Sequence, residues 1–303
     1  MITLYSSLFR LAPVRDTTLP ANQGRQIHAA FLDLIHQSDP KLSEALHDMN
    51  ERKPFSVSML EGGRNDGRTI WLREGEPCWL RFTLMGRRMF GALNQGLLAA
   101  RQPRLRIQQA ELALTAVLTT TGAHPWSGST TVDELAAQAR SEREITLQFH
   151  TPTSFEWKRR KKKSRQLELS PSFVFANLAD KWMKMGCDEA LDLAGWANKL
   201  AVLGEVAIVR PDGGQANTVD ALRGIFDAYL GVSRMRDINT HELRYHGEPF
   251  IGTTGTMTYE VFGQSELAQE VAHVANVLAD AALFFGVGSK TTHGMGQTRR
   301  LSD

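Results

Sequence analysis

The chain has 303 residues, of which 42% are hydrophobic and 22% are charged, and its formal net charge at pH 7 is +2. These values exclude a disordered chain and a protein that is basic over its whole surface, so a nucleic-acid site would have to come from a local patch. The apolar runs are too short to cross a membrane. With only two cysteines, Cys78 and Cys187, in no metal-binding spacing, we expect a cytoplasmic protein with neither a metal nor a cofactor.

The predicted elements of the first half alternate between strands and helices. Apolar periodicity predicts helices at 22–36, 40–49 and 87–101, and strands at 2–12, 55–60, 69–73, 78–85 and 105–118. Asp39 and Pro40 are expected to begin the second helix as its N-cap and its first helical residue.

The same order begins again after a polar linker around 119–129. Helices are predicted at 171–185, 188–201 and 265–285, and strands at 145–150, 206–209, 249–262 and 295–301. The repeated order strand, helix, strand, strand, helix, strand predicts an α+β fold with two tandem ferredoxin-like (βαββαβ, RRM-like) domains, at 1–125 and 140–303. Residues 212–236 have no assigned role in this pattern.

Two Gly-x-Gly pairs, five residues apart, lie near the end of the chain, in Phe285-Gly-Val-Gly-Ser-Lys-Thr-Thr-His-Gly-Met-Gly-Gln297. A helical pattern leads into this glycine loop (residues 286–296), and Gly286 is expected to end the helix. Glycines allow main-chain N–H groups to approach a phosphate, and a lysine adds a cation. We therefore expect phosphate groups to bind here, at Gly286, Gly288, Lys290, His293, Gly294 and Gly296.

Two other glycine motifs do not fit. A P-loop needs lysine directly after glycine, whereas Ser289 separates Gly288 from Lys290, and a Rossmann loop needs a preceding strand and a third glycine. A flexible turn before the last strand is the alternative interpretation.

The glycine loop resembles the C-terminal signature of the RAMP-superfamily endoribonucleases that process CRISPR repeat transcripts. Further stretches are similar to that family: Asp39-Pro-Lys-Leu-x-x-x-Leu-His47 with Lys53-Pro-Phe-Ser-x-Ser58, and Thr151-Pro-Thr-Ser-Phe155 with the helix that contains Trp182. The resemblance covers most of the chain. It implies two ferredoxin-like domains and cleavage of CRISPR repeat RNA.

Metal-independent RNA cleavage needs a base for the 2′-hydroxyl, an acid for the leaving 5′-oxygen and a cation for the phosphorane, and histidine and lysine serve these roles. The resemblance implies that His47 is the catalytic histidine and that Lys53 stabilises the phosphate. Some members carry a tyrosine on the first helix, where this chain has Leu32 at the aligned position. His28, one turn earlier, is the candidate that replaces it. The alternatives are a helix-terminal histidine at 47 and a surface histidine at 28.

A basic run follows Phe155 and Trp157, in the predicted loop between the first strand and the first helix of the second domain. Such a run binds RNA phosphates by counterion release. A solvated charge run or a localisation signal is the alternative. The residues expected to bind RNA here are Lys158, Arg159, Arg160, Lys161, Lys162, Lys163 and Arg165.

These features predict a metal-independent endoribonuclease that cleaves CRISPR repeat precursor RNA into guide RNAs with 5′-hydroxyl and 2′,3′-cyclic phosphate ends. The alternative is a non-catalytic RAMP subunit that holds CRISPR RNA in an effector complex, and His47 with Lys53 favours the enzyme. A small-molecule phosphate enzyme would need a paired-carboxylate or metal signature, which we do not find. The sequence leaves open whether the RNA is a hairpin or a single strand. It also leaves open a homodimer and association with other CRISPR effector subunits.

Overall fold

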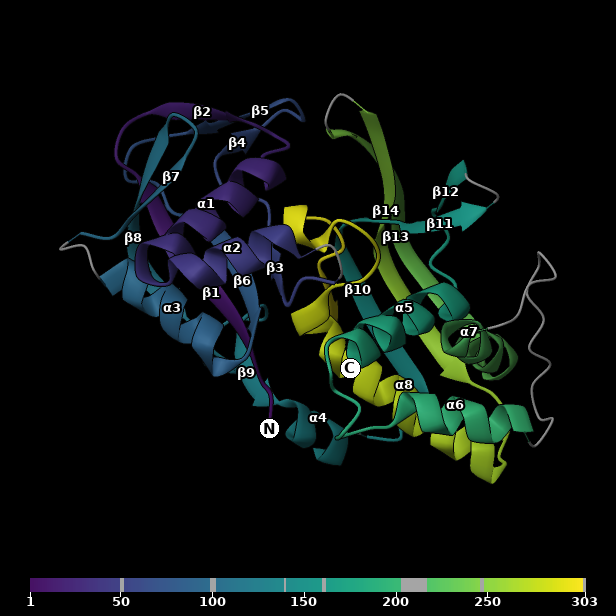
Figure 1. Ribbon diagram of the computed structural model, residues 1–303. Helices are drawn as coiled ribbons and strands as arrows, with labels where there is room; N and C mark the ends of the chain where they lie inside the picture. The colour runs from purple at the N-terminus through teal and green to yellow at the C-terminus, as the bar shows by residue number, and fades with distance from the viewer. Residues whose placement is uncertain are drawn as a thin grey trace. The chain divides into compact units, whose positions relative to one another are not determined.

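The computed structural model describes residues 1–49, 52–98, 102–138, 140–159, 162–202, 217–245 and 248–301. Its contacts divide the chain into two compact units (Figure 1). The first unit consists of Met1–Thr131, Leu243–Pro249 and Lys290–Met295, and the second contains the other described residues. Most of the glycine loop therefore packs within the first unit, although it lies near the end of the chain.

The main sheet of the first unit is antiparallel, with the strand order β3-β6-β1-β8-β7 and with β9 also paired to β1. Its strands are β1 (Thr3–Pro13), β3 (Phe55–Val57), β6 (Cys78–Met85), β7 (Arg104–Ile107), β8 (Ala110–Leu118) and β9 (Gly128–Thr131). The predicted strands at 2–12, 78–85 and 105–118 are confirmed. The last of these is split by a turn at Gln108, which has a φ of 53°.

The predicted strand at 69–73 forms, but in a different sheet. It is β5 (Thr69–Leu72), which pairs with β2 (Thr17–Pro20) and β4 (Arg64–Asn65). Along the chain, the second and third strands of the main sheet are therefore β3 and β6.

Three helices follow the predictions for the first half: α1 (Gly24–Ser38), α2 (Pro40–Asp48) and α3 (Arg87–Leu98). The Asp39 carboxylate accepts a hydrogen bond from the Leu42 N–H at 3.0 Å, so the predicted N-cap of α2 is confirmed. The Arg88 guanidinium holds the same carboxylate at 2.8 and 2.9 Å and lowers its pKa.

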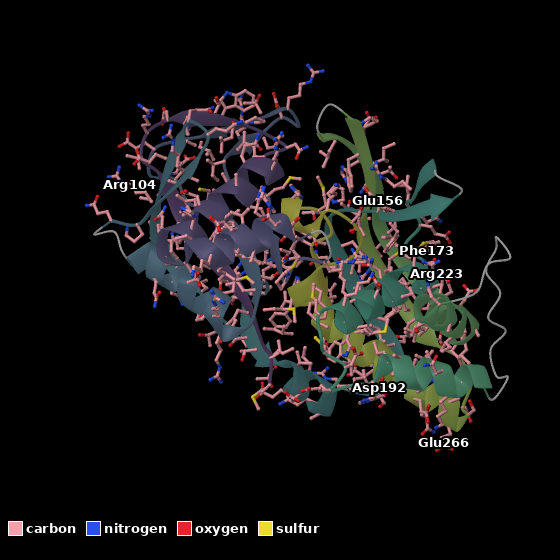
Figure 2. All side chains as sticks on the ribbon, viewed as in Figure 1. Arg104, Glu156, Phe173, Asp192, Arg223 and Glu266 are labelled. Carbon is pink, nitrogen blue, oxygen red and sulfur yellow. The ribbon has the colours of Figure 1, made fainter. Side chains whose placement is uncertain are left out.

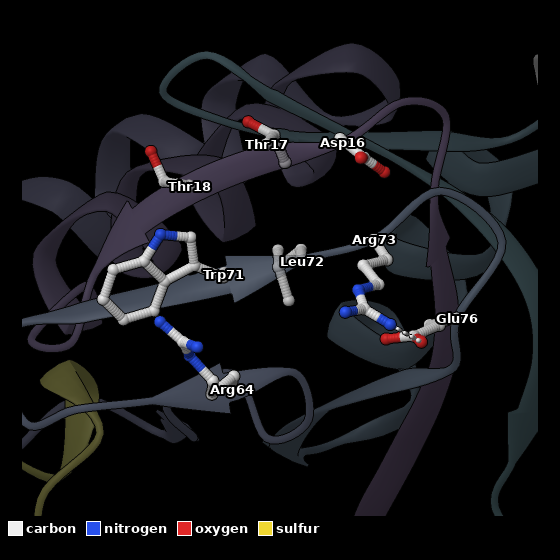
Figure 3. A pocket seen from close by; sticks show the side chains of 8 residues that line it. All are labelled: Asp16, Thr17, Thr18, Arg64, Trp71, Leu72, Arg73 and Glu76. Carbon is white, nitrogen blue, oxygen red and sulfur yellow. Dashed lines mark ion pairs between the residues drawn. The ribbon is translucent and has the colours of Figure 1, made fainter.

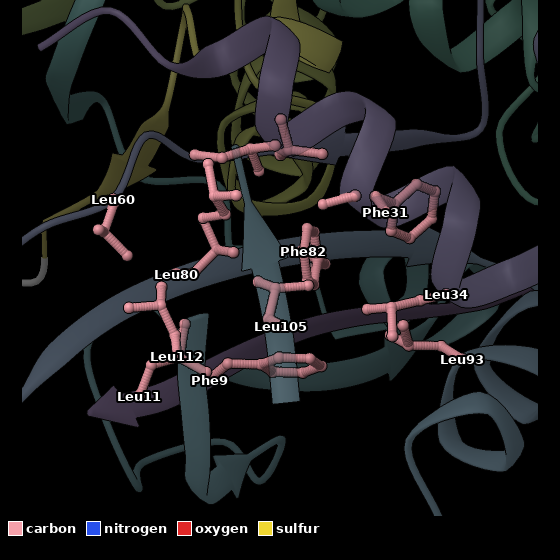
Figure 4. Close-up of a cluster of buried hydrophobic side chains, with 14 of the residues drawn as sticks. Phe9, Leu11, Phe31, Leu34, Leu60, Leu80, Phe82, Leu93, Leu105 and Leu112 are labelled. Carbon is pink, nitrogen blue, oxygen red and sulfur yellow. The ribbon is translucent and has the colours of Figure 1, made fainter. Parts of the chain in front are cut away.

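The hydrophobic core of the first unit joins α1 and α3 to the main sheet (Figure 4). Phe31 of α1 is fully buried, with its ring centroid 4.5 Å from that of Phe55 and 5.1 Å from that of Phe82. Because aromatic side chains bury large apolar areas, these contacts fix α1 against β3 and β6. Because these contacts fix Phe31, they also fix the positions of Ile27, one turn earlier on α1, and of the adjacent His28.

The second unit contains an antiparallel sheet in the order β13-β14-β10-β15. Its strands are β10 (Glu144–Thr153), β13 (Leu230–Tyr245), β14 (Glu248–Val261) and β15 (Thr298–Arg300). Its helices are α4 (Val132–Gln138), α5 (Pro171–Lys184), α6 (Leu193–Val202), α7 (Thr218–Tyr229) and α8 (Glu266–Phe285).

In the second half, one predicted helix begins later than expected and one predicted strand lies outside the described residues. The helix predicted at 188–201 begins only at Leu193, because the Asp192 carboxylate accepts the Gly195 N–H at 2.8 Å and caps the helix there. The strand predicted at 206–209 lies outside the described residues. The segment without an assigned role contributes α7, which opens with a capping box between Asn217 and Asp220, and the first part of β13.

Aromatic side chains form the core of the second unit between its sheet and helices α5, α7 and α8. Phe175 contacts Phe226 and Tyr259, with centroids 5.6 and 5.2 Å apart, and Trp182 lies 6.3 Å from Phe285. These contacts hold the C-terminal end of α8, from which the glycine loop departs.

The basic run is not a loop but an antiparallel hairpin, here called the basic hairpin. It consists of β11 (Phe155–Arg159) and β12 (Lys162–Gln166), and Lys158 pairs in register with Lys163. The run forms a hairpin because its two halves pair strand to strand, from Phe155 with Gln166 to Arg159 with Lys162. Arg160 and Lys161 lie outside the described residues. Within the described part of the chain, no helix is long and apolar enough to span a membrane.

Candidate active site

His28 lies on α1 with its half-buried ring against the glycine loop. Its Nδ1 is 2.8 Å from the main-chain oxygen of Thr292. Since a carbonyl oxygen can only accept, Nδ1 carries the proton and the neutral ring has its lone pair at Nε2. The ring stacks on that of His293, with centroids 4.6 Å apart and planes 5° from parallel.

The surroundings of His28 favour its neutral form. Burial lowers its pKa below the ordinary 6.5, and the nearby positive charges of Lys53 and His47 lower it further, against the opposing effect of the Thr292 hydrogen bond. The ring is therefore mostly neutral at pH 7. The same charge effects show that Lys53 and His47 lie near His28.

His47 lies in the last turn of α2 and its side chain is exposed. It lines a surface hollow of about 360 Å³ together with side chains of α1 and α2: Leu32, Asp33, His36, Ser43, Glu44 and Asp48. Its exposed position in the last turn of α2 leaves the ring accessible to a substrate.

Lys53 is half-buried beneath the end of α2. Its Nζ donates to the main-chain oxygen of His47 at 2.9 Å and also to that of Leu46. Burial lowers the pKa of Lys53, and the Asp48 carboxylate opposes this shift. The ammonium thus satisfies carbonyls at the end of α2 that have no partner within the helix, and it holds the turn that carries His47.

The glycine loop makes a tight turn where it packs on α1 and on the residues after β3. A 3₁₀ turn, Thr291–His293, lies between two residues in the left-handed conformation, Lys290 (φ 61°) and Gly294 (φ 84°). A Cβ on Gly294 would lie 2.7 Å from the Met59 side chain. Glycine is needed there both for its φ and for the space.

Most main-chain N–H groups of the glycine loop already donate within the protein, which corrects the expectation that they face a phosphate. Those of Gly288, Ser289 and His293 donate to the Asn177 side chain and to the carbonyls of Ser154 and Lys290, at 2.7, 2.8 and 2.9 Å. The same holds for Gly286, Val287, Met295 and Gly296. Contacts of these seven groups to RNA would require their present hydrogen bonds to break.

A buried lysine supports the start of the glycine loop in the second unit. Lys181 of α5 is only 1% exposed, and its Nζ donates to the main-chain oxygens of Phe285 and Gly286 at 3.1 and 2.8 Å. The Lys181 ammonium thus donates to carbonyls at the end of α8, where no further N–H of the helix can serve as their partner. Gly286 ends α8, as predicted.

The backbone register of the basic hairpin pairs Lys158 with Lys163 and Arg159 with Lys162. Like-charged residues at directly opposed positions of a hairpin are unfavourable. Arg165 differs from these residues, because its guanidinium lies 3.9 Å from the Glu156 carboxylate (labelled in Figure 2) and 4.6 Å from the Phe250 ring centroid.

A second hollow, of about 810 Å³, lies over the small sheet of the first unit (Figure 3). Arg64 covers the Trp71 ring at 4.6 Å, and Arg73 lies 3.8 Å from Glu76. Asp16 supplies a second carboxylate, so the two arginines are balanced by two acids. The charges in this hollow do not favour a polyanion.

Sequence reasoning did not find two contributions to this site. The Thr292 carbonyl is a main-chain group and leaves no signature in residue type. Gly24 looks like an ordinary first helical residue, yet a Cβ there would lie 1.9 Å from the His293 carbonyl oxygen.

Most of the chain is similar to proteins of one family. Residues 3–137 match the CRISPR Cas6 N-terminal domain, and residues 147–298 match CRISPR-associated endoribonuclease Cas6. Comparison with curated proteins gives no match.

Among solved structures, a Cas6 product complex is 26% identical with a TM-score of 0.75, covering 98% of this chain and 100% of that one. The Cas6 of Thermus thermophilus is 24% identical with a TM-score of 0.67, covering 99% of both chains. A Cas6 substrate mimic complex is 20% identical with a TM-score of 0.63, again covering 99% of both. With two family matches that together span most of its length, the chain belongs to the Cas6 family of CRISPR-associated endoribonucleases.

Proposed function

We propose that this enzyme cleaves CRISPR repeat precursor RNA without a metal ion, by attack of a 2′-hydroxyl on the adjacent phosphate. The products are an upstream fragment with a 2′,3′-cyclic phosphate and a downstream fragment with a 5′-hydroxyl. One observation carries the proposal: the Nδ1 of His28 lies 2.8 Å from the Thr292 main-chain oxygen, which fixes the tautomer of the ring. Burial, with the nearby charges of Lys53 and His47, lowers the pKa of His28. This set can supply the base, the acid and the cation that the reaction needs.

In this mechanism His28 is the general base. Its Nε2 lone pair accepts the 2′-hydroxyl proton, and its lowered pKa keeps the lone pair available at neutral pH. The ring already donates through Nδ1 to Thr292 and is held by that hydrogen bond. A base that is oriented before the substrate arrives loses little freedom in the transition state.

His47 is the general acid, which protonates the leaving 5′-oxygen. Histidine can give up a proton near neutral pH, and the exposed ring at the end of α2 is accessible to the leaving group. Lys53 holds the turn that carries His47 and places a positive charge near the reacting phosphate, where negative charge develops.

The RNA is proposed to bind through the basic hairpin and the side chains of Lys290 and His293, with Gly286, Gly288, Gly294 and Gly296 shaping the loop. The solved Cas6 relatives include a product complex and a substrate mimic complex, which supports an RNA partner. The lysines and arginines of the basic hairpin suit the phosphates of the repeat RNA, whether that RNA is folded into a hairpin or single-stranded. The proposal allows a homodimer and association with other CRISPR effector subunits. The low cysteine content favours a location in the cytoplasm.

We expect the double substitution Lys158→Ala/Lys163→Ala to weaken RNA binding and to reduce its salt dependence. Each lost phosphate contact should lower the slope of log affinity against log salt by about 0.7–0.9. The measurement is RNA affinity by filter binding between low and physiological salt. The matched control is Arg64→Ala/Arg73→Ala, which removes the same charge from the balanced hollow. Equal effects of the two double variants would contradict a specific role of the basic hairpin.

For the fold, we propose two ferredoxin-like domains, at 1–125 and 140–303, with the segment Lys290–Met295 packed on the first. The strand orders β8-β1-β6-β3 and β15-β10-β14-β13 support this. Each corresponds to the order fourth, first, third, second strand of a βαββαβ motif.

The proposed reaction is tested with labelled repeat RNA in EDTA, together with a copy that carries a 2′-deoxy residue at the cut site. We expect the all-ribose RNA to be cut and the deoxy copy to bind without being cut. Cutting of the deoxy copy would overturn the proposed nucleophile. Tight binding without cutting of either RNA would favour the alternative, a non-catalytic RAMP subunit.

A further inference from the structure

We infer that the glycine loop is a positioning element of the catalytic centre: the main-chain oxygen of Thr292 holds His28 in the Nδ1–H tautomer, and Gly24 provides the space for that part of the loop. This inference rests on the proposed role of His28 as the general base. It assigns to the glycine loop a role in the chemical step that is separate from RNA contact.

The loop and α1 meet in direct main-chain contact. The Nδ1 of His28 lies 2.8 Å from the Thr292 oxygen, and the next carbonyl, that of His293, lies over Gly24, one turn earlier on α1. A Cβ at Gly24 would be 1.9 Å from the His293 oxygen and 2.6 Å from its carbonyl carbon. No side chain larger than hydrogen fits there unless the loop or the helix moves.

The turn that presents Thr292 is fixed on its other side as well. The His293 N–H donates to the Lys290 carbonyl at 2.9 Å, and Gly294 lies against Met59, after β3. The stacked ring of His293 covers His28 and limits rotation of its imidazole. The loop therefore makes three contacts near His28: a hydrogen bond, a ring stack and a main-chain contact at Gly24.

The tautomer matters because only one ring nitrogen can accept a proton from the substrate. With Nδ1 donating to Thr292, the Nε2 lone pair is free for the 2′-hydroxyl. Without that acceptor the ring can carry its proton on Nε2, and this form cannot act as the base at that position. A group that orients a catalytic histidine through its second nitrogen can have a large effect on rate without touching the substrate.

The test is Gly24→Ala, with Gly91→Ala as the matched control. Gly91 is a helical glycine of α3 with no atom within 4 Å of its would-be Cβ, so alanine fits there. We expect Gly24→Ala to lower kcat about 10–100-fold, because it displaces the carbonyl that orients the base. RNA affinity should fall much less, because the substitution moves His293 but leaves the basic hairpin unchanged. Gly91→Ala should cleave like the wild type.

A spectroscopic measurement separates this role from general damage. With ¹⁵N-labelled histidine, ring nitrogen shifts report which nitrogen of His28 is protonated. We expect the Nδ1–H form in the wild type and in Gly91→Ala, and a shift toward Nε2–H in Gly24→Ala. If Gly24→Ala does not fold, Gly294→Ala disturbs the same turn from the Met59 side and should give the same shift.

The inference is overturned if the folded Gly24→Ala variant, or Gly294→Ala in its place, cleaves like the control or keeps the Nδ1–H form while losing activity. Failure of the proposed function would look different. It would show as a wild-type enzyme that does not cut the RNA, or as a His28 variant that retains full activity.

Discussion

His28→Gln is expected to lower kcat about 10²–10⁴-fold, the usual contribution of a positioned general base. The glutamine amide can still donate to the Thr292 carbonyl and fill the half-buried space, but it cannot accept a proton at neutral pH. RNA affinity should stay close to the wild-type value, because glutamine can keep the hydrogen bond to the Thr292 carbonyl and the basic hairpin is unchanged. Single-turnover cleavage with separate affinity measurements checks this prediction.

The control for this variant is His36→Gln, an exposed histidine two turns further along α1. It should leave the rate unchanged. Equal rates for His28→Gln and the wild type would remove His28 from the mechanism and leave it as a structural histidine.

The pH dependence of kcat/KM gives an independent measure of the same residue. Because burial and nearby charge lower the pKa of His28, the base stays deprotonated as pH falls through 6.5, so the acid limb should lie below pH 6.5. The lowered pKa also means that the unfolded chain binds a proton at His28 more readily than the folded chain does. The free energy of unfolding should therefore fall as the pH drops below 6.5. An acid limb well above 6.5 that His28→Gln does not alter would contradict the assignment.

His47→Ala should produce the second large loss, again about 10²–10⁴-fold in kcat, because the leaving oxygen then departs without a proton. A substrate with sulfur in place of the leaving 5′-oxygen tests the role directly, since a thiolate leaves without protonation. This substrate should restore most of the rate to His47→Ala and little to His28→Gln.

The control for His47 is His36→Ala, which lines the same hollow on the α1 side. It should cleave both substrates like the wild type. If the sulfur substrate rescues His28→Gln instead of His47→Ala, the two histidines have the opposite roles.

The elements that the sequence predicted well are those with strong local signals. Asp39 and Pro40 define the start of α2 because capping depends on neighbouring residues alone. Gly286 ends α8 for the same reason. The resemblance implied His47 and Lys53, and helical spacing from Leu32 gave His28 as a candidate. The fold brings Lys53 and His47 close enough to His28 for their charges to lower its pKa.

The features that the sequence did not predict depend on tertiary contacts. The strand at 69–73 carries no signal that it pairs with residues 17–20 instead of the main sheet. The orientation of His28 comes from a carbonyl 264 positions away in the sequence. Lys53, which precedes a proline and would ordinarily be solvated, is half-buried because the end of α2 lies over it.

The chemistry of the product ends tests the central claim most directly. After cleavage of repeat RNA in EDTA, mass spectrometry of both fragments identifies the groups at the cut. Attack by the 2′-hydroxyl predicts a 2′,3′-cyclic phosphate on the upstream fragment and a 5′-hydroxyl on the downstream one. A 3′-hydroxyl paired with a 5′-phosphate would mean that water attacked the phosphate, and it would contradict the roles proposed for His28 and His47.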